Sequence, residues 1–105
     1  MIDKSADKPR GLPAEIGRIA YSRQGRDKGR YFMITEVIDE QYVFIADGVV
    51  RKLIKPKRKK LKHLALKPII LEGIAEKLKN NVKVFDAELK SAIINTGLIS
   101  QKEEG

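Results

Sequence analysis

The chain has 105 residues and a net charge of +8, with no cysteine and a single histidine, His63. These totals exclude disulfides, thiolate chemistry and paired-histidine metal sites, and they disfavour a histidine-centred catalytic device. No apolar run is long enough to cross a membrane, and the polar first residues lack the apolar segment of a signal peptide. We therefore expect one small cytoplasmic domain with no cofactor, no metal and no membrane partner.

The positive charge is concentrated in one segment. Residues 51–67 contain nine lysines and arginines and no acid, while the other 13 basic residues are balanced by all 14 acidic ones. Such segregation is typical of a protein that contacts a polyanion, either nucleic acid or an anionic membrane surface. The basic run lacks interleaved tryptophan or phenylalanine and lies between predicted strands, which disfavours the membrane alternative.

The first half of the chain predicts short strands. After a polar tail over residues 1–14, for which we expect disorder, alternating side chains predict a strand over residues 15–22. Residues 31–38 and 42–46 are rich in β-branched and aromatic side chains and predict two more strands. The second of the three carries Phe32, Met33 and Ile34 in succession, so we expect both of its faces to be covered.

Asp47-Gly48 follows the third strand and favours a two-residue type I′ hairpin. The pair predicts a return strand over residues 49–53, which Pro56 would end because proline lacks the N–H that a sheet needs. A fifth strand is expected over residues 61–66. Four or five short strands joined by local turns indicate a mainly β fold, a small SH3-like barrel over residues 15–67.

The pattern changes after Pro68 to that of helices. Leu71, Ile74, Ala75 and Leu78 follow helical spacing, and Lys79-Asn80-Asn81 should end this first helix. A second helix is expected over residues 87–96, with Asp86 as its cap and Gly97 just beyond its end. We expect residues 68–105 to form a helical appendage with a frayed end from residue 100.

The loop between the first two strands carries a family resemblance. Gly29, the basic Lys28 before it and the apolar strand over residues 33–37 resemble the KOW motif, in which a strand, a glycine-centred loop and a second strand follow one another. Many members have a second glycine where this chain has Tyr31-Phe32-Met33. The chain is similar to KOW-class large-subunit ribosomal proteins of the fourteen-e, six-e and twenty-seven-e type. This resemblance implies an SH3-like barrel that binds structured RNA, often ribosomal RNA.

The physical chemistry of the loop and of the basic run points to the same ligand. Glycines let the backbone approach phosphates, and arginine can grip a phosphate or stack on a base. We expect the loop to supply shape and the basic run to supply most of the affinity. The predicted RNA-binding residues are Arg23, Gln24, Gly25, Arg26, Lys28, Gly29, Arg30, Arg51, Lys52, Lys55, Lys57, Arg58, Lys59, Lys60 and Lys62.

Several alternatives stay open from the sequence. The loop could be an ordinary solvated turn, and the basic run could be a nuclear address or a solvated segment. The chain could instead be a protein-interaction module of the translation or transcription machinery, with Leu71 and Ile74 on a docking surface. Of the six aromatic residues we expect most in the core, with Tyr31 the best candidate for a ring that stacks on a base. No enzyme motif is present, and we expect a non-catalytic protein that binds RNA and possible ribosomal-protein neighbours, in an oligomeric state that the sequence leaves open.

Overall fold

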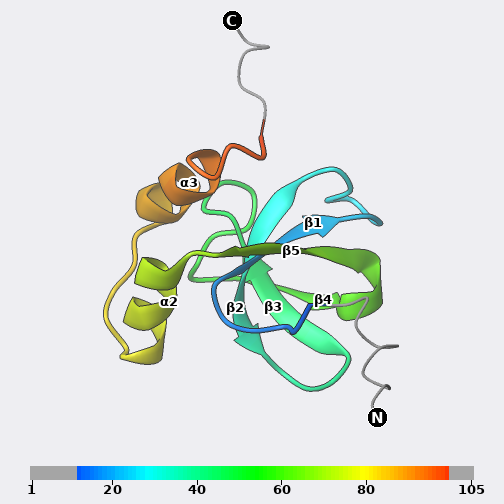
Figure 1. The fold of residues 1–105 in the computed structure, drawn as a ribbon, viewed down its shortest axis with the longest axis horizontal. Coiled ribbons are helices and arrows are strands. Elements are labelled where there is room, and N and C mark those ends of the chain that lie inside the picture. Colours follow the sequence, from blue (N-terminus) through cyan, green and yellow to red (C-terminus); the bar gives the residue numbers. More distant parts are fainter. Residues whose placement is uncertain (1–11, 100–105) are drawn as a thin grey trace, which may run out of the picture.

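The computed structural model describes residues 12–99 and contains one antiparallel sheet of five strands. The strands are β1 Arg18–Ser22, β2 Tyr31–Val37, β3 Tyr42–Ala46, β4 Lys57–Lys60 and β5 Leu64–Ile70, in the order β4-β3-β2-β1-β5. A single 3-10 turn, η2 Leu61–His63, joins β4 to β5, although these are the two edges of the sheet. So short a connection requires the sheet to curl until its edges approach one another, as Figure 1 shows. The predicted barrel-like fold with two C-terminal helices is confirmed.

Strand β2 explains why the fold has two hydrophobic clusters. Phe32, Met33 and Ile34 all have 0% exposure, so both faces of this strand are covered, as expected. Phe32 and Ile34 join a cluster with Val43 and Ile45 inside the curled sheet. Met33 points to the opposite face and joins a second cluster, to which the C-terminal helices contribute.

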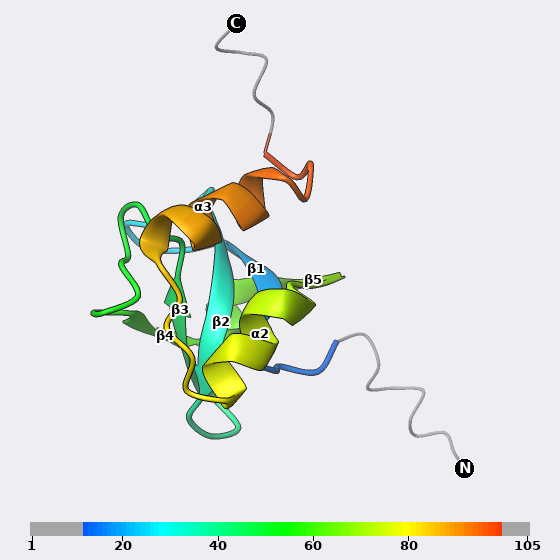
Figure 2. The ribbon, with the colours of Figure 1, turned by 90° about the vertical axis from the view of Figure 1, so that its left-hand side faces the viewer.

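The helices α2 Glu72–Lys79 and α3 Asp86–Ile94 cover the outer face of the sheet near β2 (Figure 2). Their buried side chains are those that the helical spacing selects, including Ile74, Leu89 and Ile93. The end predicted for the first helix is confirmed, because Asn80 follows the last residue of α2. The second helix begins one residue earlier and ends two residues earlier than predicted, at Asp86 and Ile94, and Gly97 has a positive φ of 82° beyond it. The helices therefore share a core with the sheet.

The hairpin prediction at Asp47-Gly48 is wrong. No strand forms over residues 49–53; instead the Asp47 Oδ1 atom accepts hydrogen bonds from the backbone N–H groups of Val49, Val50 and Arg51 at 2.9–3.0 Å. A carboxylate that satisfies three consecutive donors replaces the ladder that a hairpin would need. Gly48 does adopt positive φ, at 81°, but within an irregular loop.

The neighbouring predictions need smaller corrections. The expected strand over residues 61–66 is half η2 and half β5, and β5 continues through Pro68, which is tolerated because β5 is an edge strand. The expected strand over residues 15–22 starts only at Arg18. Asp86 makes no capping hydrogen bond and instead accepts one from the Leu53 N–H at 2.8 Å. The tail and frayed end that we expected fall outside the described residues, apart from residues 12–14.

Candidate nucleic-acid interface

The loop over residues 23–30 is a closed, hydrogen-bonded turn between β1 and β2. Gly29 donates to the Ser22 carbonyl at 2.8 Å, and Lys28 and Arg30 donate to the carbonyls of Gly25 and Asp27 at 3.1 Å each. Gly25 and Gly29 have φ of 87° and 90°, a conformation that glycine adopts without strain. The N–H groups of residues 28–30 are therefore already occupied and cannot serve a phosphate.

The tip of the same loop is different. Within residues 12–99 the backbone N–H groups of Gln24, Gly25 and Arg26 have no hydrogen-bond acceptor. Three successive free donors around a residue with positive φ are the arrangement that binds anions in backbone nests. The Arg26 and Lys28 side chains are exposed beside them.

Two residues of the basic segment, Lys59 and Arg51, bind this loop through their side chains. The Lys59 side chain is only 8% exposed, and its Nζ donates to the Gln24 carbonyl at 2.8 Å. Arg51 makes a two-pronged contact with the buried Asp27 carboxylate, with Nε–Oδ2 and Nη2–Oδ2 distances of 3.1 and 3.0 Å. The charges of Lys59 and Arg51 thus fix the loop rather than face solvent, which the sequence did not indicate.

Arg23, at the start of the loop, is hydrogen-bonded to η2. Arg23 donates from its backbone to the His63 carbonyl at 2.9 Å and from its guanidinium to the Lys62 carbonyl at 2.9 Å. Partial burial and the nearby cations, Lys62 first among them, lower the pKa of His63 below its ordinary value of 6.5. His63, which lies in the 3-10 turn, is therefore mostly neutral near pH 7.

The remaining predicted cations differ in their surroundings. Arg30 is exposed but bonds the Asp47 carboxylate at 3.2 Å. On the outer face of β3 and β4, the Arg58 guanidinium lies 4.0 Å from the centroid of the Tyr42 ring and Lys60 Nζ lies 5.6 Å from it. Besides Arg23 and Arg58, the predicted cations that are exposed and have no acidic partner among the described residues are Arg26, Lys28, Lys52, Lys55, Lys57 and Lys62.

The chain resembles curated proteins over most of its length. It is 30% identical over 94 residues to the large ribosomal subunit protein eL14 of Hyperthermus butylicus, which covers 89% of each chain. The eL14 of Staphylothermus marinus is 32% identical over 94 residues, covering 89% of this chain and 91% of the relative. The chain belongs to the eL14 family. No protein-family model matches the chain, but the relatives confirm the predicted similarity to KOW-class ribosomal proteins and select its fourteen-e branch.

The aromatic residues of this eL14-family chain are distributed differently from our expectation. Only Phe32 is fully buried, whereas Phe85 is 62% exposed and Tyr31 and Tyr42 are half-buried. Tyr42 is a candidate site residue that sequence reasoning missed. The alternation of side chains along β3 places Tyr42 on the outward face, opposite Lys60. This position could be interpreted only once β4 was known to pair with β3.

No three His, Asp or Glu side chains among residues 12–99 gather closely enough to hold a metal ion. Neither described helix has the length and apolar character needed to cross a membrane.

Proposed function

We propose that this eL14-family chain is a non-catalytic RNA-binding protein of the large ribosomal subunit, located in the cytoplasm and in contact with ribosomal RNA. The observation that carries the proposal is the family relationship across 89% of the chain, because the relatives are large ribosomal subunit proteins. The distribution of cations around the loop supports RNA as the direct ligand.

The loop tip is suited to one or two phosphates. The free N–H groups at Gln24, Gly25 and Arg26 can donate to phosphate oxygens, and Gly25 has no side chain that would obstruct the approach. Arg26 adds a guanidinium that can bind two phosphate oxygens at once. Since Lys59 and Arg51 anchor the loop, it needs little reordering on binding.

The exposed lysines extend this contact along the molecule. Lys52, Lys55 and Lys57 lie around Pro56 on one shallow surface, and Lys62 lies on η2 beside the start of the loop. Each cation that neutralises a phosphate releases counterions, so the affinity should fall steeply with salt. The Arg58 guanidinium lies over the Tyr42 ring, where it can stack on an exposed base.

Sedimentation of extracts from cells that produce the full chain tests the ribosomal assignment. We expect the protein to travel with the large subunit at low salt and to dissociate as salt rises. The double variant Lys55→Gln/Lys57→Gln should dissociate at lower salt than Lys79→Gln/Lys90→Gln, a control with the same loss of charge on the exposed surface of the helices. A protein that stays at the top of the gradient at every salt concentration would refute the ribosomal assignment.

A protein contact is a second candidate, and exposed apolar side chains favour it. Ile54 is 91% exposed and Phe85 is 62% exposed, and the Leu53–Asp86 hydrogen bond holds their two segments together. The sequence suggested Leu71 and Ile74 as docking residues. They pack instead in the hydrophobic cluster between the sheet and the C-terminal helices. If the Ile54→Ser/Phe85→Ser variant keeps its affinity for purified RNA but leaves the particle more readily, this surface contacts a neighbouring protein.

A further inference from the structure

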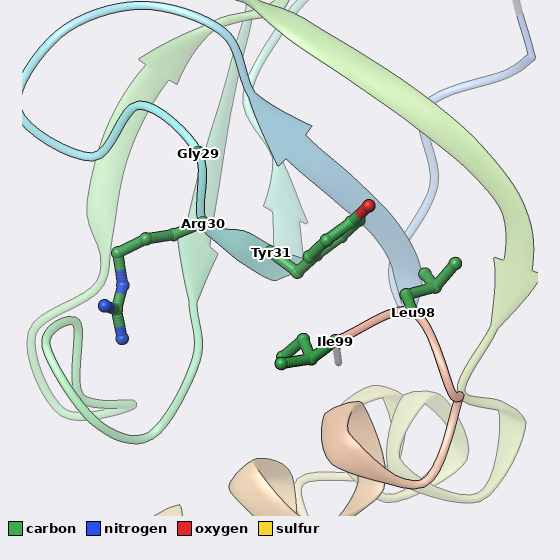
Figure 3. A pocket seen from close by; sticks show the side chains of 5 residues that line it. All are labelled: Gly29, Arg30, Tyr31, Leu98 and Ile99. Carbon is green, nitrogen blue, oxygen red and sulfur yellow. The ribbon is translucent and has the colours of Figure 1, made fainter. Parts of the chain in front are cut away.

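A pocket of about 300 Å³ lies where the loop enters β2, between the sheet and the segment that follows α3. Its lining residues are Gly29, Arg30, Tyr31, Leu98 and Ile99 (Figure 3). Two of these belong to the candidate RNA-binding loop, so the pocket is continuous with the interface described above. The other wall comes from the end of the helical appendage.

The walls of this pocket are mostly apolar, although Arg30 is one of the residues that line it. Tyr31 is half-buried, and its ring is supported by Tyr21, with centroids 5.0 Å apart and planes tilted by 56°. Leu98 and Ile99 present aliphatic side chains toward the same space, as Figure 3 shows. The Arg30 side chain points away from Tyr31, since its guanidinium bonds Asp47 at 3.2 Å. The interior therefore suits a neutral planar group rather than a phosphate.

The surroundings of the pocket are positively charged. Arg26 and Lys28 are exposed on the adjoining loop, and Lys67 Nζ lies 5.8 Å from the centroid of the Tyr21 ring. An apolar slot with a cationic rim matches a nucleotide, whose base is neutral and whose phosphates are anionic. A base within a duplex stacks on its neighbours and cannot enter, so the occupant must be unpaired.

We propose that this pocket binds a single unpaired RNA base, which stacks on Tyr31 while the flanking phosphates contact the loop. The proposal rests on the proposed function and deepens it, because it gives the loop and the helical appendage a joint role. The loop alone would recognise a phosphate backbone, whereas the pocket would recognise a bulge or a loop in the RNA.

Three RNA hairpins of the same stem provide the test: one fully paired, one with a single bulged uridine, and one with an abasic residue at the bulge. We expect the full-length protein to prefer the uridine bulge to the abasic bulge by about 5- to 150-fold, the range that one stacked base contributes. Tyr31→Phe should retain this preference for the uridine bulge, and Tyr31→Leu should abolish it.

A second pair of variants avoids the core. Ile99 is exposed at the mouth of the pocket, so Ile99→Asp should repel the approaching nucleotide, whereas the matched Ile99→Asn should not. Equal affinity of the wild type for the uridine and abasic bulges would overturn the base pocket and leave the RNA-binding function intact. Failure to bind any of the three hairpins would overturn the proposed function, and the pocket with it.

Discussion

Lys57 and Lys59 lie two residues apart on β4, yet substitution by glutamine should weaken RNA binding in different ways. Lys57 is exposed and has no acidic partner among the described residues, whereas Lys59 is 8% exposed and donates to the Gln24 carbonyl at 2.8 Å. Lys57→Gln removes a cation that can reach phosphate. Lys59→Gln removes a support of the loop.

The salt dependence of binding separates these effects. Losing one phosphate contact lowers the slope of log affinity against log salt by about 0.7–0.9. When salt rises from about 50 to about 200 mM, the drop in affinity of Lys57→Gln should therefore be about threefold smaller than that of the wild type. Lys59→Gln should leave the slope unchanged. It should instead reduce the free energy of unfolding by about 1–3 kcal/mol, the usual cost of losing a buried hydrogen bond from a charged donor.

Filter binding to a structured RNA across this salt range, together with urea unfolding of each variant, measures both quantities. Lys79→Gln, an exposed change at the end of α2, controls for the loss of one charge. If Lys59→Gln lowered the slope as much as Lys57→Gln while unfolding at the same urea concentration as wild type, the assignment of Lys59 to the loop would be wrong.

Three further predictions concern single positions. Gly48→Ala should unfold at markedly lower temperature than Gly29→Ala, because a Cβ at Gly48 would collide with the Asp86 carbonyl whereas the space at Gly29 is open and leaves only the positive-φ strain of about 1–2 kcal/mol. Gly29→Val should weaken RNA binding with no change in salt slope, measured by the same titration. The pKa of His63 is lower in the folded protein, so the unfolded chain binds the imidazole proton more tightly than the folded one does. The free energy of unfolding should therefore keep its full value above pH 6.5 and decrease as the pH falls through the folded pKa. Urea unfolding of His63→Gln should lack this decrease.

Much of the fold followed from the sequence where local pattern and tertiary environment agree. The three consecutive apolar residues at Phe32 to Ile34 required a strand covered on both faces, and the structure supplies a cluster on each side. The helical spacing around Ile74 selected the side chains that face the sheet. Gly97 adopts the positive φ predicted for it, in the turn that follows α3.

The failures have a different cause, which is competition from side-chain and long-range contacts that the hydrophobic pattern does not reveal. Asp47-Gly48 has the local signature of a hairpin, but the Asp47 carboxylate accepts hydrogen bonds from the backbone N–H groups of Val49, Val50 and Arg51. Strand β4 consists of Lys-Arg-Lys-Lys, which has little intrinsic preference for a strand. It forms because it pairs with β3 and places Arg58 over Tyr42, and neither partner is near it in the sequence.

The same reasoning changes how the charge of the chain should be interpreted. Composition counts Arg51 and Lys59 among the cations available to RNA, yet the first neutralises Asp27, 24 residues away, and the second satisfies a loop carbonyl. Reversing every charge from Arg51 to Lys62 would therefore abolish RNA binding whether or not the segment touches RNA, because the loop would lose both supports. Only substitutions confined to exposed cations such as Lys55 and Lys57 can attribute a loss of affinity to phosphate contact.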